Sequence, residues 1–594
     1  MKKKISTVIV IVLMCIGGGL FPVEASEPGV SENDKLKSLF EREWQARIDR
    51  DPALASQMRQ KGKDHLLLDV SPVAYQAWAK QTEQFLKKLK EIDFKQLTHE
   101  NQINYQIFES QLKRRISEIE FKSYEIPFLS DSGFHTSILR LDQLVEFREQ
   151  KDFQNYLKRL SAIPRFFEQN KENMKAGISR GFSMPKIVMH GFTDVLRNAY
   201  EKPYDKSSFY LPFKKMPAHL SQEMQDSLKS SAKLVINNEV FPALKSMAEF
   251  FDNYYIPQTR ETLAAHALPN GQSYYQAQIN HYTTLSLNAE DIHEIGLAEV
   301  KRIRKEMEEV IKLSGHQGSF KSFLSFLRES PQFYAKTAED LIKEASYIAK
   351  RMDGELPKLF TRLPRQPYTV KPVPAEIAPK YTTGRYSGAP IDSDRAGEYW
   401  VNTYALDKRP LYVLEALTLH EAVPGHHLQT ALNRELTDVP EFRRGSYISA
   451  FGEGWGLYSE RLGLEVGFYK DHYSNFGRLT YEMWRAARLV IDTGIHAKGW
   501  SREQAIKLLE ENSALSTHNI RTEVDRYISW PGQALSYKLG EIKIRELRAF
   551  AEKSLGNKFD LRRFHDSVLE NGSIPLSILE NKIIEFVERE KINK

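Results

Sequence analysis

The chain has 594 residues, of which 41% are hydrophobic, so it can bury a substantial core and exceeds the size of one ordinary compact domain. Its 84 basic and 78 acidic residues nearly balance at a net charge of +6, and such a mixture is typical of a solvated surface. This balance argues against nucleic acid as a partner.

The first 25 residues have the parts of a signal peptide. A basic "MKKK" precedes the apolar run "ISTVIVIVLMCIGGGLF", and "PVEAS" supplies Ala25 as the cleavage position. We therefore expect residues 1–25 to be a signal peptide and the protein to be exported, as a secreted, periplasmic or cell-envelope protein. The alternative is an uncleaved anchor, which would be the source of any membrane contact. Cleavage would remove Cys15, the only cysteine, and with it any disulfide or cysteine nucleophile.

Most of the remaining sequence repeats apolar residues every three or four positions, as in "DKLKSLFEREWQARI" and "NAEDIHEIGLAEVKRIRKEMEEVIKL". This period predicts a mainly α fold. A loop rich in Pro, Gly and Asn, "HALPNGQSYY", separates an N-terminal helical region, 26–275, from a second helical region, 276–594, which carries the candidate catalytic motif. The alternation in "GEYWVNTYA", Gly397 to Ala405, predicts a short edge strand or a hairpin near that motif.

The segment "LTLHEAVPGHHLQTAL" holds three histidines and a glutamate. The zinc-protease motif H-E-x-x-H places two imidazoles one helical turn apart, but here Pro424 occupies the position of the second histidine. Pro424 lacks the N–H that would bond the carbonyl of His420, and Gly425 tolerates unusual backbone angles, so we expect the helix to break and return a later histidine to a metal. His426 is the favoured second ligand and His427 the alternative; the histidine that is not a ligand would support the site or contact substrate.

A zinc site also needs a third protein ligand and, for catalysis, an open position. The helix-forming segment "SAFGEGWGLYSERLGLE" offers Glu453 as that ligand, while Glu460, two turns further along the same face, could orient a ligand histidine. The alternative is a pair of ordinary surface glutamates. Two imidazoles and a carboxylate favour zinc, so one Zn2+ ion is the expected cofactor.

Three sequence blocks follow one another along the chain: "HEAVPGHHLQ", "GEGWGLYSE" and "RYISWPGQALSYKLG". Together they resemble the bacterial family catalogued as domain of unknown function 885, whose members are predicted zinc metallopeptidases distantly similar to thimet oligopeptidase and angiotensin-converting enzyme. The resemblance covers most of the chain after the signal segment. It implies a mostly helical fold with a deep central cleft, a gluzincin-like zinc site of two histidines and a glutamate, and hydrolysis of peptides. The inserted Pro-Gly departs from the H-E-x-x-H pattern.

Roles for other residues follow from the chemistry of such a site. Glu421, next to the first ligand, would take a proton from the attacking water and pass it to the leaving amine. A further donor must stabilise the oxyanion, and "GQALSYKLG" resembles the tyrosine-bearing stretch near the end of oligopeptidase catalytic domains. Tyr537 is therefore the first candidate, followed by Tyr527 and Arg526.

One long predicted helix, "MWRAARLVIDTGIHAKGWS", carries four more candidates. They form either a clamp for a substrate carboxylate or a buried structural network: Arg485, Arg488, Asp492 and His496. His293 and Glu294 have no second histidine at metal spacing, so we expect them near a helix start with a contact to the cleft.

These patterns predict an exported zinc-dependent hydrolase that acts on a peptide or a small amide, with a metallopeptidase as the leading interpretation. Two alternatives stay open: a metal-dependent amidase or esterase for small molecules, and a catalytically inactive binding protein of the same fold. No phosphate-binding loop or dinucleotide fingerprint supports another class of enzyme. The sequence leaves the oligomeric state open.

Overall fold

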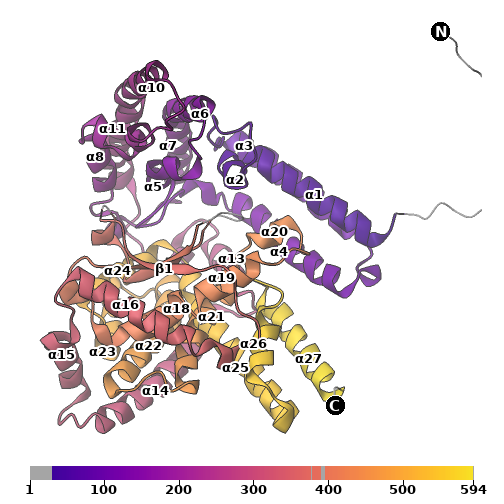
Figure 1. The fold of residues 1–594 in the computed structure, drawn as a ribbon, viewed down its shortest axis with the longest axis vertical. Coiled ribbons are helices and arrows are strands. Elements are labelled where there is room, and N and C mark those ends of the chain that lie inside the picture. The colour runs from indigo at the N-terminus through magenta and orange to yellow at the C-terminus, as the bar shows by residue number, and fades with distance from the viewer. Residues whose placement is uncertain (1–29, 376, 390–394, 593–594) are drawn as a thin grey trace, which may run out of the picture.

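Helices account for nearly all of the regular structure in the computed structural model, which describes residues 30–375, 377–389 and 395–592 (Figure 1). The predicted mainly α fold is thus confirmed. The predicted signal peptide, residues 1–25, and Cys15 lie outside the described residues. None of the helices in those three ranges is both long and apolar enough to span a membrane.

The first part of the chain builds the upper half of the molecule as drawn in Figure 1, in indigo to magenta. Its longer helices bury one apolar stripe each; in α3, for example, Trp78, Phe85 and Leu89 face the core. The α-helices of this part are α1 (Glu32–Arg50), α2 (Pro52–Gln57), α3 (Pro72–Lys90), α4 (His99–Glu120), α5 (Phe134–Ser137), α6 (Gln150–Ser161), α7 (Ile163–Ser179), α8 (Asp194–Tyr200), α9 (Leu211–Lys214), α10 (Gln222–Val235), α11 (Phe241–Phe250) and α12 (Ile256–Gln258).

The second part of the chain builds the lower half, in magenta to yellow. Residue 275, where we expected the boundary between two regions, lies inside the first of its helices. The α-helices of this part are α13 (Gly271–Thr283), α14 (Ala289–Leu313), α15 (Phe320–Glu329), α16 (Ala338–Asp353), α17 (Leu356–Leu359), α18 (Leu414–Glu421), α19 (His426–Arg434), α20 (Glu441–Arg444), α21 (Ser449–Glu465), α22 (His472–Lys498), α23 (Arg502–Asn512), α24 (Thr517–Ser529), α25 (Ser536–Leu555), α26 (Leu561–Leu569) and α27 (Leu576–Ile592).

Helix α22, which has 27 residues, is the central element of this lower half. Its residues from Phe476 to His496 are all buried, and it packs against α14, α21, α24 and α25. Asp471 caps its start by accepting the backbone N–H groups of Tyr473 and Ser474, and Gly499, at φ 71°, ends it in the left-handed conformation that suits glycine. A helix buried on all sides gives a rigid frame to the side chains that project from it.

A small sheet lies between the two halves (Figure 1). Strand β1 (Tyr368–Pro372) pairs in parallel with β3 (Gly397–Val401), which pairs antiparallel with β2 (Gly384–Ser387). The strand predicted in this part of the sequence is therefore shorter than expected and central, not at the edge, because β1 adds to its second side. The hairpin alternative is the one that the structure has, and β2 is an edge strand that lies against α18.

Helices α21 and α25 approach each other through glycine. A Cβ placed on Gly540 of α25 would lie 2.0 Å from the carbonyl oxygen of Ala450 and 2.7 Å from the Cα of Gly454, both on α21. Only a residue without a side chain fits this crossing. The crossing positions the candidate site, because α21 carries Glu453 and α25 carries Tyr537.

Replacing Gly540 by alanine is expected to lower the free energy of unfolding by about 1–3 kcal/mol, because the added methyl group must push two backbones apart, which outweighs alanine's better helix propensity. Urea denaturation measures the change. Gly445→Ala is the control: no described heavy atom lies within 4 Å of a Cβ there, so the change should stay below about 0.5 kcal/mol. Equal stability of Gly540→Ala and the wild type would contradict the close crossing.

Candidate metal centre

The helix that begins the histidine segment breaks where the sequence predicts a break. Helix α18 ends at Glu421, and α19 begins at His426. Between them Ala422 and Gly425 have ψ angles of −111° and −129°, far from helical values. The N–H of His427 then donates to the carbonyl of Ala422 at 3.0 Å, five residues back, and so bridges the interruption.

Two contacts hold this break in a compact shape. A Cβ on Gly425 would lie 1.9 Å from the carbonyl oxygen of His420, so the two backbones touch and no side chain fits between them. The buried indole N–H of Trp455 on α21 donates to the carbonyl of Pro424 at 2.8 Å. The peptide bond between Val423 and Pro424 is cis. The break is therefore fixed to the neighbouring helix.

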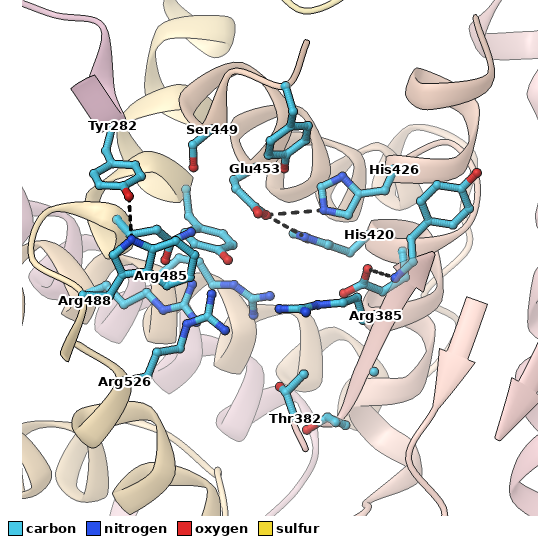
Figure 2. A pocket seen from close by; sticks show the side chains of 18 of the residues that line it. Tyr282, Thr382, Arg385, His420, His426, Ser449, Glu453, Arg485, Arg488 and Arg526 are labelled. Carbon is cyan, nitrogen blue, oxygen red and sulfur yellow. Dashed lines mark hydrogen bonds and ion pairs between the residues drawn. The ribbon is translucent and has the colours of Figure 1, made fainter. Parts of the chain in front are cut away.

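The break brings His420, His426 and Glu453 together (Figure 2). Oε2 of Glu453 lies 3.6 Å from Nε2 of His420 and 3.4 Å from Nε2 of His426, and the three ligand atoms lie within 4.8 Å of one another. Two ligands about 2.1 Å from a tetrahedral metal ion stand roughly 3.4 Å apart, so these atoms fit around one small cation. Two imidazole nitrogens and a carboxylate oxygen are a donor set that zinc prefers.

Glu460 fixes the orientation of the first histidine. Its Oε1 lies 2.8 Å from Nδ1 of His420, and its side chain is 1% exposed. When Nδ1–H donates to Glu460, the lone pair of Nε2 is left for a ligand on the Glu453 side. Burial alone lowers the pKa of His420, but the hydrogen bonds to Glu453 and Glu460 outweigh it and raise this pKa to about 9. The site is thus rich in negative charge and favours a cation.

Glu421 lies beside the cluster and lines the same cavity. Its Oε2 accepts the backbone N–H of Tyr386, in the edge strand β2, at 2.7 Å. The side chain is buried, yet one face reaches the cavity, so the carboxylate can meet a molecule bound there. The edge strand therefore sets the position of the residue that we expect to act as a base.

His427 points away from the cluster, so the structure corrects the expectation that it could be the second ligand. Its Nε2 lies 3.0 Å from the carbonyl of Gln366, to which it must donate a proton, and its Nδ1 accepts from the hydroxyl of Tyr386 at 3.1 Å. Burial lowers the pKa of His427 to about 4, which keeps the ring neutral. The two nitrogens attach α19 to β2 and to the segment before β1, and His426 alone of the two adjacent histidines joins the cluster.

A cavity of about 500 Å³ opens onto the cluster, at the site where the resemblance implies a deep central cleft. Its lining comes from segments far apart in the sequence: Arg114 on α4, Tyr282 on α13 and Arg385 on β2 line the same cavity as the histidines. Figure 2 shows the guanidinium groups of Arg485, Arg488 and Arg526 gathered beside the cluster. Both halves of the chain thus contribute to one site.

The three candidates for stabilising an oxyanion lie in different surroundings. Tyr537 lines the cavity with its ring 6.4 Å from that of His420, at 23° between the planes. Arg526 also lines the cavity, with its guanidinium over the ring of Trp530. Tyr527 is not among the lining residues, because its hydroxyl accepts the N–H groups of Trp484 (2.6 Å) and Arg488 (2.9 Å) behind the wall. The structure thus removes Tyr527 from contact with a ligand.

Several lining residues had no signal in the sequence. Tyr447, in the loop before α21, lies with its ring 6.4 Å from that of His426 and lines the cavity. Arg114 comes from a helix in the other half of the chain. Tyr386 and Arg385 belong to a turn-rich segment whose pattern indicates an edge strand at most. These residues reach the histidines only through the fold, so no sequence motif close to the histidines indicates them.

The four candidates on α22 divide into two pairs. Asp492 accepts the hydroxyl of Tyr275 at 2.6 Å and the N–H of Gly532 at 3.1 Å, all three groups being buried. His496 is buried and hydrogen-bonded at both ring nitrogens. These two residues form the structural network that was one of the alternatives for this helix.

The arginines of the same helix, Arg485 and Arg488, line the cavity. His293 does not, because it is buried against α22, where its Nδ1 lies 2.8 Å from the hydroxyl of Thr493. Glu294 is exposed on α14. The expected contact of His293 and Glu294 with the cleft is therefore absent from the described residues.

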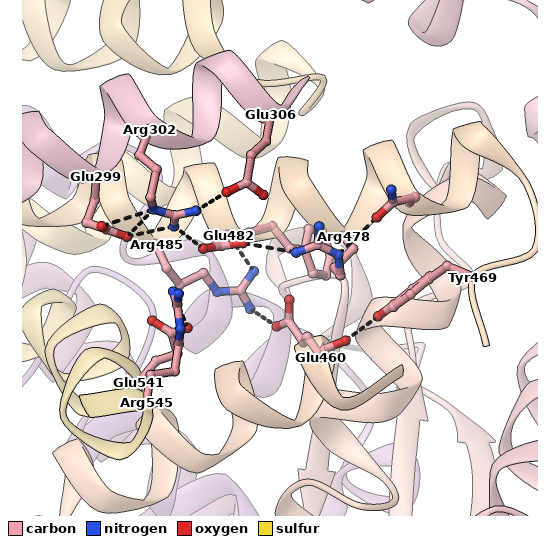
Figure 3. A network of polar contacts seen from close by, with 12 residues as sticks. Glu299, Arg302, Glu306, Glu460, Tyr469, Arg478, Glu482, Arg485, Glu541 and Arg545 are labelled. Atoms are coloured by element: carbon pink, nitrogen blue, oxygen red, sulfur yellow. Dashed lines mark hydrogen bonds and ion pairs between the residues drawn. The ribbon is translucent and has the colours of Figure 1, made fainter. Parts of the chain in front are cut away.

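A partly buried ion-pair network links α14, α22 and α25 (Figure 3). Arg302 on α14 pairs with Glu299 and with Glu482 on α22. Nζ of Lys538, which is 0% exposed, lies 2.9–3.0 Å from the carboxylates of Glu299, Glu482 and Glu541. Removing one partner would leave a buried charge unpaired, so these contacts fix the start of α25, where the candidate tyrosine lies.

The fold and the site define a large helical protein with a candidate metal centre inside a cavity. The chain belongs to the family described as "Bacterial protein of unknown function (DUF885)", whose model matches residues 52–583, which confirms the resemblance to that family. No curated protein matches the sequence.

Two solved structures are similar over nearly the whole chain. The "putative lipoprotein" from Colwellia psychrerythraea is 28% identical with a TM-score of 0.87, and the match covers 94% of this chain and 100% of that one. A "putative lipoprotein of unknown function" from Shewanella oneidensis is 18% identical with a TM-score of 0.71, covering 93% and 100%. The second shares the fold at a low identity.

The pKa of Asp492 predicts how stability depends on pH. Burial raises this pKa to about 7 in the folded protein, from an ordinary value of 3.8, so the folded state holds a proton that the unfolded chain releases between these values. Stability from this group is present below about pH 4 and is lost as pH rises through about 7, on the order of 4 kcal/mol in all. Asp492→Asn should remove that slope in urea denaturation at several pH values. Parallel pH profiles for variant and wild type would contradict it.

Proposed function

We propose that this protein is an exported zinc-dependent hydrolase and, more specifically, a metallopeptidase. The observation that carries the proposal is the convergence of His420, His426 and Glu453 at one wall of a large cavity, with Glu421 directly beside them. The alternative of an inactive binding protein needs neither a metal donor set nor a carboxylate next to it.

The chain's own residues divide the work of hydrolysis. His420, His426 and Glu453 would hold the ion, and Glu460 keeps His420 in the tautomer that offers Nε2 to it. When bound, zinc supplies a Lewis acid that polarises a carbonyl and lowers the pKa of a coordinated water. Glu421 accepts a proton from the attacking water and returns it to the leaving amine, held in place by the backbone N–H of the edge strand.

A hydroxyl or a guanidinium group close to the cluster would stabilise the oxyanion. Tyr537 is the first candidate, since its ring lies parallel to that of His420 and faces the cavity. Tyr447, beside His426, is the second and replaces Tyr527 in the order expected from the sequence. A preorganised donor of this kind adds to the stabilisation that the metal supplies.

The edge strand favours a peptide over a small amide or ester. Residues Thr382 to Tyr386 all line the cavity, and on the side of β2 away from β3 no described strand pairs with it. An extended peptide can bind such an edge by backbone hydrogen bonds, beside the metal ligands. A small ester would use the same ligands but would gain nothing from the strand.

Two observations support export. The sequence begins with the three parts of a signal peptide, and a 28% identical structural relative is described as a "putative lipoprotein". We infer that the hydrolase acts outside the cytoplasm, in the cell envelope or beyond it.

The Glu421→Gln variant tests the proposed base. Replacing the carboxylate by an amide removes the proton acceptor, so the hydrolysis of a peptide that the wild type cleaves should fall by about 100-fold or more, while bound zinc stays the same. A peptide library followed by mass spectrometry measures the first quantity, and elemental analysis measures the second.

The matched control is Glu294→Gln, the same change at an exposed position on α14, which should keep full activity. Full activity of Glu421→Gln would rule out its role as the base. Cleavage of small esters or amides without cleavage of any peptide would favour the alternative of a small-molecule hydrolase.

A further inference from the structure

The arginines of the cavity exceed what the proposed zinc chemistry needs. Three carboxylates face the same space, and two of them, Glu421 and Glu453, belong to the proposed catalytic group, which leaves Glu523. Positive charge in excess within a partly enclosed cavity favours an anionic ligand. The lining arginines are Arg114, Arg385, Arg434, Arg485, Arg488 and Arg526.

Two of the three guanidinium nitrogens of Arg488 have hydrogen-bond partners among the described residues. Its Nε donates to the hydroxyl of Tyr527 and its Nη2 to Glu523, each at 2.9 Å, and its Cζ lies 4.1 Å from the centre of the Tyr537 ring. The third nitrogen, Nη1, is buried without a hydrogen-bond partner among the described residues. The side chain as a whole is 3% exposed, so bulk water does not serve this group.

Arg485, one turn earlier on α22, repeats the pattern. The residue is 4% exposed, its Nη2 pairs with Oε1 of Glu460 at 3.7 Å, and its Nε has no hydrogen-bond partner in the described part of the chain. Buried charged N–H groups nearly always find an acceptor, because leaving one unpaired is costly. The two residues lie three apart on one face of the helix and both line the cavity, so an acceptor on a molecule bound there is the partner that we infer.

One aromatic ring separates Arg488 from the candidate metal centre. The Tyr537 ring lies 4.1 Å from the guanidinium of Arg488 and 6.4 Å from the ring of His420. An extended peptide advances roughly 3.3–3.6 Å per residue, so a chain with its scissile bond at the cluster reaches the arginines within about three residues. The acceptor is then part of the same substrate.

We propose that Arg485 and Arg488 form a subsite for a substrate carboxylate, placed within about three residues of the bond that is cleaved. The inference rests on the proposed hydrolase function and names the class of substrate for it. A guanidinium matches a carboxylate through paired, charge-assisted hydrogen bonds, which an ammonium group cannot reproduce. The carboxylate comes from the C-terminus of a peptide or from an aspartate or glutamate side chain near it.

The test compares three forms of one peptide that the purified protein cleaves: the parent, a form with an amidated C-terminus, and a form with Asn and Gln in place of Asp and Glu. We expect kcat/KM to fall about tenfold or more in one altered form, mainly through KM, and that form identifies the source of the carboxylate. In Arg488→Lys the difference between the forms should shrink to less than about threefold.

Arg478→Lys is the matched control, because Arg478 is a buried arginine of the same helix that bonds Glu482 at 3.0 Å and does not line the cavity. This variant should keep the preference among the three peptides. Arg485→Lys serves as a second variant if Arg488→Lys fails to fold. Equal kcat/KM for all three forms in the wild type, or an equal loss on all three in Arg488→Lys, would overturn the subsite and leave both arginines a structural role.

A binding measurement tests the carboxylate subsite independently of hydrolysis. Calorimetric titration of the Glu421→Gln variant with the same three forms of a peptide that contains Asp and Glu, whether or not the wild type cleaves it, reports the carboxylate preference without any cleavage, with and without Arg488→Lys. A preference for the carboxylate that depends on Arg488, in a protein whose wild type hydrolyses no peptide, would overturn the hydrolase and support the subsite. Hydrolysis without a carboxylate preference would overturn the subsite and support the hydrolase.

Discussion

The contact between the broken histidine helix and α21 sets the geometry on which the site depends. His420 and His426 face one carboxylate because the chain turns sharply between them, with Gly425 packed against the carbonyl of His420. Helix α21 holds that turn: Trp455 bonds the carbonyl inside it, and a Cβ on Gly456 would lie only 2.7 Å from the imidazole of His420. The same helix supplies the two carboxylates that flank this imidazole, Glu453 and Glu460.

Two groups of opposite charge meet in the cavity. Carboxylates around two imidazoles favour a cation, and buried guanidinium groups with unused donors favour an anion. Arg485 joins the two groups, because its Nη2 lies 3.7 Å from Oε1 of Glu460. Lys538, directly after Tyr537, is held by the carboxylates of Glu299, Glu482 and Glu541. The rigid support that these contacts give is what an accurately positioned site needs, because small displacements of reacting groups are costly. A peptide with a carboxylate near its scissile bond matches both groups at once.

The sequence was sufficient for features that depend on local chemistry and not for those that depend on the path of the chain. The helical period predicts the fold class, and the missing N–H of Pro424 predicts the break. The choice between His426 and His427 was open because it depends on how the chain leaves the break. Tyr527 and Tyr537 belong to one sequence block, but only packing against α22 shows which of them faces the cavity. Contributions from remote elements, such as Arg114, left no pattern near the motif.

Zinc content per chain tests the central claim most directly. Elemental mass spectrometry on purified wild type should find about one zinc ion per chain, and the same amount in His427→Ala, whose side chain only attaches α19 to the sheet. The adjacent variant, His426→Ala, should lose the ion, as should His420→Ala. No zinc in the wild type after incubation with the metal, or equal zinc in His426→Ala, would contradict the site described above.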